Sequence, residues 1–467
     1  MLTTTRKALH SIWMKLNSNK NRIKTRDGSQ LKAEPSPKKG QFTFGLRTVP
    51  KIKTTGYRLI WLVACSFLLV FILSNCNVRK GVYIQKLENK YYRLMVNGKP
   101  CIVKGVCYNP IPIGSNHEYD WWSDPNKPWI VDGKLMKQMG INTIRLYQTH
   151  ENSNEVKQVI RDLYNLYGIR TLLGDWLGFW EYPCPFYGDK KFQDKVKKQV
   201  LEMVSLYKDE PGLLGWILGN ENNYSCLGQV NPWSTPEVDL EPDPQKQKKM
   251  RAQIYYSFIN DISKAVHKID PDHPVGLGNG ELIGLDSANQ FCQDVDFVAC
   301  IIYRGKTFGN LFRSLRMTFD KPILLAEFGA DCYDAYLKKE DQNMQAFFLE
   351  QQWNQIYENL GDKKNGEGNC LGGTIFEWAD EWWKHTQDSP DSWKEHDTGA
   401  GWSSGSYYFD IRAEKNMNMN EEWFGIVALS PELENGINKR IPRKAYYVLR
   451  EFWKKPVIKK ARNNKAK

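Results

Sequence analysis

The sequence predicts an α/β fold, a (β/α)8 TIM barrel preceded by a single N-terminal transmembrane helix. Three observations predict the barrel. Short β-branched runs alternate with longer amphipathic stretches, there are eight candidate strands, and polar and aromatic residues cluster just after the strand ends. Eight strand–helix repeats indicate a closed parallel barrel. An open doubly wound sheet gives the same alternation with fewer strands, but no GxGxxG phosphate loop follows the first strand.

The individual elements follow from the pattern of apolar residues. A hairpin is expected first, because residues 91–96 alternate and meet Asn97-Gly98, a strong turn signal. The candidate strands are residues 102–107, 143–147, 170–174, 214–218, 275–277, 296–302, 323–327 and 373–378. The clearest helical patterns are residues 156–167, 191–207, 250–269 and 341–359.

Residues 59–78 contain no charged side chain, and residues 59–73 read LIWLVACSFLLVFIL. This length is close to the roughly 20 apolar residues that cross a bilayer, whereas a globular helix would carry a polar stripe. The long basic segment before it disfavours a cleaved signal peptide. The positive-inside rule then predicts a cytoplasmic tail (1–58), a signal anchor (59–78), an exported barrel domain (79–455, periplasmic, extracellular or lumenal) and a basic C-terminal tail (456–467).

The distribution of charge argues against a nucleic-acid partner. The formal net charge is +12, and residues 1–58 account for all of it, with fourteen Lys/Arg and two Asp/Glu. The rest of the chain is formally neutral, although its last fourteen residues contain seven Lys/Arg and no Asp/Glu. The exported domain therefore lacks the basic surface that binding to a phosphate backbone requires.

Two glutamates follow apolar strands whose ends would meet at one mouth of the barrel. Glu221 comes after the fourth strand and Glu327 after the seventh. Hydrolysis of a glycosidic bond needs such a pair, one carboxyl to protonate the leaving oxygen and one to attack or to activate water. The alternative for either residue alone is an ordinary ion pair. Together, at these two strand ends, they favour catalysis.

These residues resemble the signature of the clan A retaining β-glycosidases. The run LMVNGKPCIVKGVCY (94–108), GINTIRLY from Gly140, LAEFGA from Leu325 and RKAYYVLREFW from Arg443 are similar to the catalytic barrel of glycoside hydrolase family 2. The opening segment and Asn220-Glu221 are also similar to the family 72 β-1,3-glucanosyltransferases. The resemblance covers residues 91–455, but no sugar-binding and immunoglobulin-like domains precede the barrel, as they do in typical family 2 enzymes.

The resemblance implies roles for particular residues. Glu221 matches the acid/base and Glu327 the nucleophile of the clan. Asn220 matches a residue that hydrogen-bonds the sugar 2-hydroxyl. Arg145 matches an arginine that keeps the nucleophile ionised, although a structural ion pair with a barrel glutamate would explain it equally well.

Three aromatic residues are also candidates for substrate binding. Tyr303 matches a tyrosine that hydrogen-bonds the nucleophile, and Trp378 matches the platform under the reacting sugar. For both, packing at the barrel rim is the alternative. Trp176 belongs to a set of tryptophans near the predicted loops, which would stack on pyranose rings and indicate an oligosaccharide or polysaccharide substrate. The alternative is that these tryptophans pack the long loops onto the barrel.

Other candidate residues give weaker signals. The seven histidines have no i, i+4 pair and no HExxH motif, so neither a metal nor another cofactor is expected. The carboxylates of Asp331, Asp380 and Glu381 are expected at the solvated rim of the cleft. Eight cysteines lie in the predicted exported domain, and their spacing does not reveal a connectivity.

The sequence therefore predicts a membrane-anchored retaining β-glycosidase that acts by double displacement on a β-linked oligo- or polysaccharide, with β-glucan favoured. A β-glucanosyltransferase would use the same residues. A third alternative is a non-catalytic barrel that binds glycan or associates with polysaccharide-synthesis machinery in the membrane.

Overall fold

The computed structural model describes residues 79–455, apart from 336, 364, 385–388 and 399–419. The predicted cytoplasmic tail (1–58), signal anchor (59–78) and basic C-terminal tail (456–467) lie outside the described residues. In the part that is described, no helix combines the length and the apolar character needed to cross a membrane. The membrane helix thus remains a prediction from the sequence.

Eight parallel strands close into a barrel, which confirms the predicted TIM-barrel architecture. Each strand pairs with the next strand of the barrel along the chain, and the last, β13, pairs with the first, β4. The barrel strands are β4 (Val103–Cys107), β5 (Thr143–Leu146), β6 (Arg170–Asp175), β7 (Leu213–Leu218), β8 (Val275–Gly280), β9 (Phe297–Ile301), β10 (Ile323–Phe328) and β13 (Cys370–Ile375).

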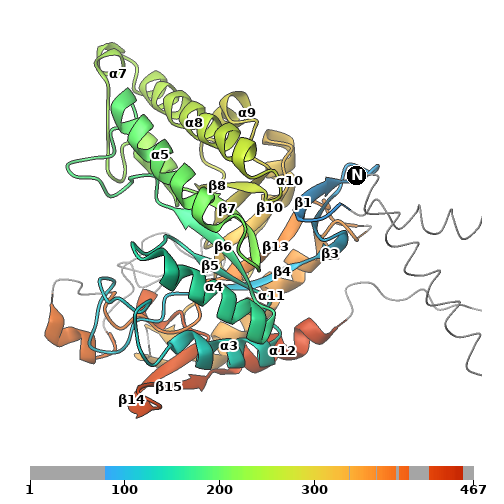
Figure 1. Ribbon diagram of the computed structural model, residues 1–467, viewed down its shortest axis with the longest axis vertical. Coiled ribbons are helices and arrows are strands. Elements are labelled where there is room, and N and C mark those ends of the chain that lie inside the picture. Colours follow the sequence, from blue (N-terminus) through green and yellow to red (C-terminus); the bar gives the residue numbers. More distant parts are fainter. Residues whose placement is uncertain (1–78, 336, 364, 385–388, 399–419, 456–467) are drawn as a thin grey trace, which may run out of the picture. The chain divides into compact units, whose positions relative to one another are not determined.

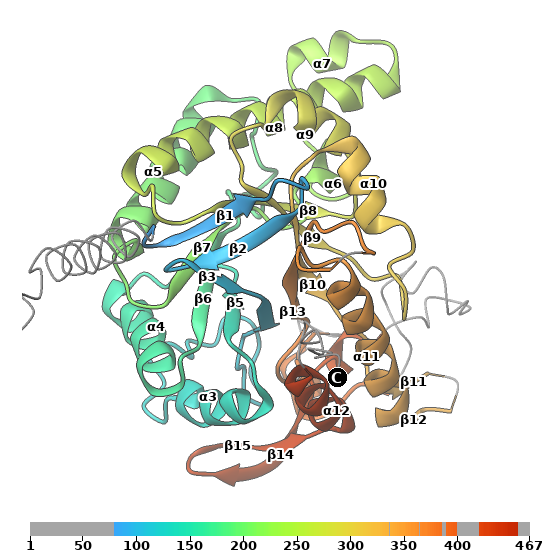
Figure 2. The same ribbon diagram turned by 90° about the vertical axis from the view of Figure 1, so that its right-hand side faces the viewer.

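Helices surround the barrel, as Figure 2 shows. Those connecting successive strands are α3 (Pro128–Met139), α4 (Ser153–Tyr167), α5 (Lys190–Tyr207), α8 (Pro244–Ile269), α9 (Leu285–Phe291), α10 (Leu311–Thr318) and α11 (Gln342–Glu358). Local sequence sets their starts, because Asn152, Asp189, Asp243 and Asp341 each accept a backbone N–H at the beginning of a helix. Two short helices, α6 (Asn223–Cys226) and α7 (Pro236–Leu240), lie between β7 and α8.

The predicted strands and helices agree with the structure except at two barrel strands. The fifth was predicted at residues 275–277, but β8 continues to Gly280. The eighth was predicted at residues 373–378, but β13 spans Cys370–Ile375. Two glycines, Gly372 and Gly373, weaken the strand signal at its true start. The alternation of Phe376, Glu377 and Trp378 after Ile375 resembles a continuation of the strand, so the prediction ended three residues late.

A three-stranded antiparallel sheet closes the amino-terminal end of the barrel. It consists of β1 (Val82–Lys86), which was not predicted, β2 (Tyr92–Val96) and β3 (Lys99–Cys101). The Asn97-Gly98 turn joins β2 and β3, and both residues have positive φ, as a type I′ hairpin requires. Val82, Tyr92 and Leu94 form one buried cluster with residues at the starts of the barrel strands, including Val103 and Leu324.

The chain after β13 covers the side of the barrel near α3 and α11, as Figure 1 shows. It contains the 3-10 helices η1 (Pro390–Lys394) and η2 (Glu421–Trp423), the hairpin of β14 (Val427–Glu434) and β15 (Ile437–Pro442), and the helix α12 (Lys444–Lys454). A small hairpin of β11 (Tyr333–Asp334) and β12 (Lys339–Glu340) precedes α11. Arg443, just before α12, is 1% exposed and makes a two-point ion pair with Asp380 at 2.6 and 2.7 Å.

Candidate active site

A cavity of about 640 Å³ opens at the carboxyl ends of the barrel strands. Its lining comes from residues at or just after the ends of β4, β5, β6, β7, β9, β10 and β13, and from η2. The predicted residues Trp176, Asn220, Glu221, Tyr303 and Glu327 all line it. This is the end of the barrel at which TIM-barrel enzymes place their reacting groups.

Glu327, in β10, is held by three side chains. Its Oε1 accepts hydrogen bonds from Nη1 of Arg145 at 3.0 Å and from the hydroxyl of Tyr147 at 2.7 Å. Its Oε2 accepts a hydrogen bond from the hydroxyl of Tyr303 at 3.0 Å. Three donors on two oxygens fix the orientation of the carboxyl group, as a positioned nucleophile requires.

Arg145 connects three barrel strands beneath the cavity. It is 1% exposed in β5, and its Nη1 also donates to the backbone carbonyl of Ala326 at 2.9 Å. Its Nη2 donates to Oδ1 of Asn220 at 2.5 Å, just past the end of β7. The guanidinium therefore makes the expected ion pair with Glu327 and also orients Asn220.

A strained turn after β7 presents Glu221. Gly219 and Glu221 have φ of 80° and 59°, and a side chain is uncommon in that region unless the surroundings enforce it. Asn222, which is fully buried, accepts the backbone N–H of Asn220 and donates to the carbonyl of Trp176 at 2.9 Å. The turn lies so close to β8 that a Cβ atom on Gly278 would come 2.0 Å from the Gly219 carbonyl oxygen.

The surroundings of Glu221 favour its protonated form. Burial, followed by the charges of Glu327 and Glu421, raises the pKa of Glu221 to about 8, against a smaller opposing effect of Arg145. A neutral carboxylic acid beside a glutamate paired with arginine is the pattern expected of an acid and a nucleophile that work together. The two glutamates thus occupy different electrostatic environments within one cavity.

The predicted aromatic residues have different positions. Trp176 lines the cavity and stacks on Tyr147 with ring centroids 5.5 Å apart, and Trp180, next to it, is 64% exposed. Trp378 is 1% exposed, packs in the hydrophobic core and is not among the described residues that line the cavity. Because β13 ends three residues earlier than predicted, Phe376 lines the cavity instead.

Sequence reasoning missed four residues that belong to the site. Tyr147 could have been found, because it lies two positions after Arg145 and strand side chains two apart share a face. Asn222 carries no signal apart from its position in the turn. Glu377 and Glu421 line the cavity, and only the tertiary fold brings Glu421 there.

The three carboxylates expected at a solvated rim are buried instead. Asp380 pairs with Arg443, Asp331 accepts the backbone N–H of Asn420 at 3.0 Å, and Glu381 is 3% exposed inside the cavity. The expectation failed because the segment after β13 folds back over these residues.

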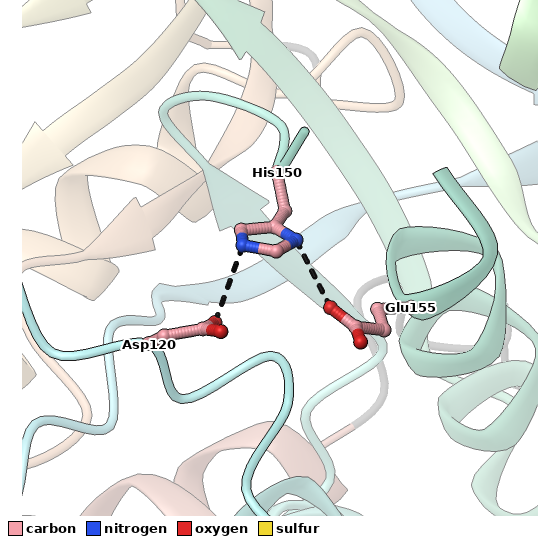
Figure 3. A group of neighbouring side chains, drawn as sticks. All are labelled: Asp120, His150 and Glu155. Carbon is pink, nitrogen blue, oxygen red and sulfur yellow. Dashed lines mark ion pairs between the residues drawn. The ribbon is translucent and has the colours of Figure 1, made fainter. Parts of the chain in front are cut away.

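A second group of titratable side chains lies at the edge of the cavity. Figure 3 shows the ring of His150 between Asp120 and Glu155, with nitrogen–oxygen distances of 3.4 and 3.0 Å. This is the one group of His, Cys, Asp and Glu with metal-binding spacing among the described residues. The two carboxylates approach opposite ring nitrogens and hold the imidazole in place. The His150 ring also stacks on Trp122, with the ring centroids 6.4 Å apart.

Curated proteins with similar sequences are sugar-processing enzymes. The chain is 26% identical over 148 residues to a β-galactosidase of Oenococcus oeni, an alignment that covers 31% of this chain and 13% of the enzyme. It is 28% identical over 128 residues to the 1,3-β-glucanosyltransferase gel2 of Aspergillus fumigatus, covering 26% of this chain and 25% of that protein. The chain is related to glycoside hydrolases and transglycosylases. Both resemblances predicted from the sequence, to β-glycosidases and to β-1,3-glucanosyltransferases, are confirmed.

The fold of the chain is similar to that of a larger protein of known structure. A β-glucuronidase of Bacteroides uniformis superposes with a TM-score of 0.51 at 15% identity, over 80% of this chain and 37% of that enzyme. No protein-family model matches the chain. The alignments with these two curated relatives span a quarter of their length or less.

Proposed function

We propose that the chain is a retaining β-glycosidase that acts on a β-linked oligo- or polysaccharide. The observation that carries the proposal is the electrostatic contrast between two glutamates in one cavity. Glu221 is partly exposed in the cavity, and burial of its carboxyl group together with the charges of Glu327 and Glu421 raises its pKa to about 8, whereas Glu327 is paired with Arg145 at 3.0 Å. The similarity to a β-galactosidase and to a glucanosyltransferase supports the same class of reaction.

The reaction would proceed by double displacement. Glu327 attacks the anomeric carbon while Glu221 gives its proton to the leaving oxygen, so that a glycosyl–enzyme ester forms and the glycosidic C–O bond breaks. Glu221 then takes a proton from the incoming acceptor, which displaces Glu327 from the anomeric carbon. Arg145, Tyr147 and Tyr303 hold the carboxylate in line, and Asn220, oriented by Arg145, contacts the sugar 2-hydroxyl.

The acceptor decides between hydrolysis and transglycosylation. Aromatic side chains at the cavity, Trp176 and the exposed Trp180, support binding of a second sugar chain by stacking. The similarity to gel2 favours a β-glucan as the first substrate to test. Incubation with a β-1,3- or β-1,4-linked oligosaccharide separates the two reactions, because only transglycosylation gives products longer than the substrate.

The decisive experiment replaces Glu327 by Gln. Turnover of every β-linked substrate should vanish, whereas glycan binding measured by calorimetry should persist. Glu202→Gln, on the exposed face of α5, is the matched control and should retain full activity. Turnover by Glu327→Gln at the wild-type rate would refute the mechanism, and glycan binding without turnover in the wild type would favour the non-catalytic barrel.

We also propose that residues 59–78 anchor the enzyme in a membrane with the barrel domain on the exported side. The support is the uncharged apolar run and the excess of basic residues on its amino side. Protease protection of the full chain in sealed vesicles, compared with a variant that lacks residues 1–78, tests both the anchor and the orientation.

A further inference from the structure

The wall of the cavity that follows β13 carries a group of carboxylates that the proposed reaction does not use. We call Glu377, Glu381, Glu421 and Lys384 the acidic corner. Lys384 Nζ lies 2.9 Å from Glu381 Oε2 and 3.7 Å from Glu421 Oε2. Glu381 also accepts a hydrogen bond from the Asn109 amide at 3.3 Å. Lys384 therefore pairs with two of the three glutamates, Glu381 and Glu421.

Glu377 is the residue whose hydrogen bonding is incomplete. It is 2% exposed and lines the cavity, and its buried Oε1 has no hydrogen-bond partner among the described residues. A buried polar atom without a partner is costly, so such an atom beside a cavity indicates a ligand that supplies a donor. Burial, together with the charge of Glu381, raises the pKa of Glu377 well above its usual range.

The acidic corner adjoins the reacting glutamates. Burial, followed by the charges of Glu381 and Glu327, raises the pKa of Glu421 against the effect of Lys384. Glu421 in turn contributes to the raised pKa of Glu221. A sugar that is attacked by Glu327, or the sugar next to it, would therefore lie within reach of this corner.

The titratable groups that line the cavity are mostly acidic. Seven carboxyl residues and one lysine belong to the lining in the described part of the chain. Glu327 is compensated by Arg145 from below, and Glu221 favours its protonated form, so the remaining carboxyls of the lining share Lys384. A uronic acid would bring another negative charge next to these carboxylates, which is unfavourable in a partly desolvated cavity. The three glutamates of the corner also do not form a group with metal-binding spacing in the described part of the chain, so a single metal ion does not fit them.

We propose that the acidic corner is a subsite for the ammonium group of an amino sugar, so that the β-linked glycan bound in the cavity contains unacetylated glucosamine-type residues. This inference rests on the proposed glycosidase function and names its substrate class. The ammonium group would donate hydrogen bonds to Glu377 Oε1 and to Glu421 and would restore the balance of charge. N-acetylation would remove that charge, and a carboxylate on the sugar would reverse it.

The first test compares substrates of equal length with the wild-type enzyme. Chitosan tetraose, its fully N-acetylated form, cellotetraose and a β-glucuronide are assayed at roughly pH 6, where a sugar amine is protonated. The expected result is kcat/KM for chitosan tetraose at least about tenfold above that for cellotetraose, the effect of one charge-assisted hydrogen bond, and no turnover of the glucuronide. Turnover of the glucuronide, or equal use of the neutral and the amino oligosaccharide, would overturn the inference.

The second test assigns the preference to the corner. Glu377→Gln keeps the shape of the side chain and should reduce the preference for chitosan tetraose over cellotetraose to roughly one. Glu118→Gln removes a charge from an exposed part of the same cavity and should keep the preference. Equal loss in both variants would mean that only the overall charge of the cavity matters, and retention in both would exclude Glu377.

A binding measurement keeps the inference falsifiable if turnover is too slow to measure. Calorimetric titration of Glu327→Gln with chitosan tetraose should show tighter binding than with cellotetraose, and adding Glu377→Gln should abolish the difference. If the wild type cleaves cellotetraose in a Glu327-dependent reaction but neither binds nor cleaves the amino sugar better, the inference fails and the glycosidase function stands. If no β-glycoside is cleaved or bound, both fail.

Discussion

Replacing Glu221 by Gln should stabilise the fold in a way that depends on pH. The surroundings raise the pKa of this carboxyl from 4.5 to about 8, so ionising it costs about 5 kcal/mol more in the folded protein than in the unfolded chain. Water in the cavity screens part of this cost, which makes the figure an upper bound. Glutamine carries no proton to lose and avoids the cost.

The direction follows from the protons bound in each state. Between pH 4.5 and about 8 the unfolded chain has lost the Glu221 proton while the folded protein retains it, so the stability contributed by this group falls as the pH rises. The slope is at most about 1.4 kcal/mol per pH unit. The difference between Glu221→Gln and the wild type should be near zero below the lower pKa, grow through this window and level off above the upper one.

Urea denaturation at pH values from roughly 4 to roughly 9 measures this difference directly. Glu202→Gln, on the surface of α5, is the control and should follow the wild type at every pH. A difference that does not change with pH would mean that Glu221 titrates normally. A difference of the opposite sign would mean that Glu221 is an ionised, paired carboxylate, which would remove the proposed acid.

Two further predictions test positioning and stability. Tyr147→Phe removes the 2.7 Å hydrogen bond to Glu327 and should lower kcat about tenfold or more with little change in KM, measured by steady-state kinetics; an unchanged kcat would exclude a role in orienting the carboxylate. Arg443→Met leaves Asp380 buried without its partner and should reduce the free energy of unfolding by about 3 to 5 kcal/mol in urea. Arg450→Met, on the exposed side of α12, should change it little, and equal losses would contradict the argument.

The barrel could be predicted from the sequence because its signals are local. Short β-branched runs that alternate with amphipathic stretches identify the repeats, and the Asn97-Gly98 turn identifies the hairpin before the barrel. Glu221 and Glu327 could be predicted to share one cavity, because residues that follow parallel barrel strands emerge at the same end. The position of Trp378 was predicted less well, since glycines at the start of β13 obscure where that strand begins.

The acidic wall of the cavity could not be predicted from the sequence. Glu421 lies more than 90 residues after Glu327 and reaches the cavity only because the segment after β13 returns over the barrel end. The burial of Asp380 depends on Arg443, which lies 63 residues further along the chain. Contacts of this kind leave no periodic pattern in the sequence. These carboxylates were therefore expected at the solvated rim of the cleft.

The sheet of β1, β2 and β3 has a practical consequence for making the domain alone. Its apolar side chains, including Tyr92 and Leu94, cover apolar residues at the amino-terminal ends of the barrel strands. A recombinant protein that starts at the first barrel strand would expose these apolar residues to water and would be prone to aggregate. Expression should therefore begin upstream of Val82, and loss of solubility on trimming to residue 102 would show how much the barrel depends on this cover.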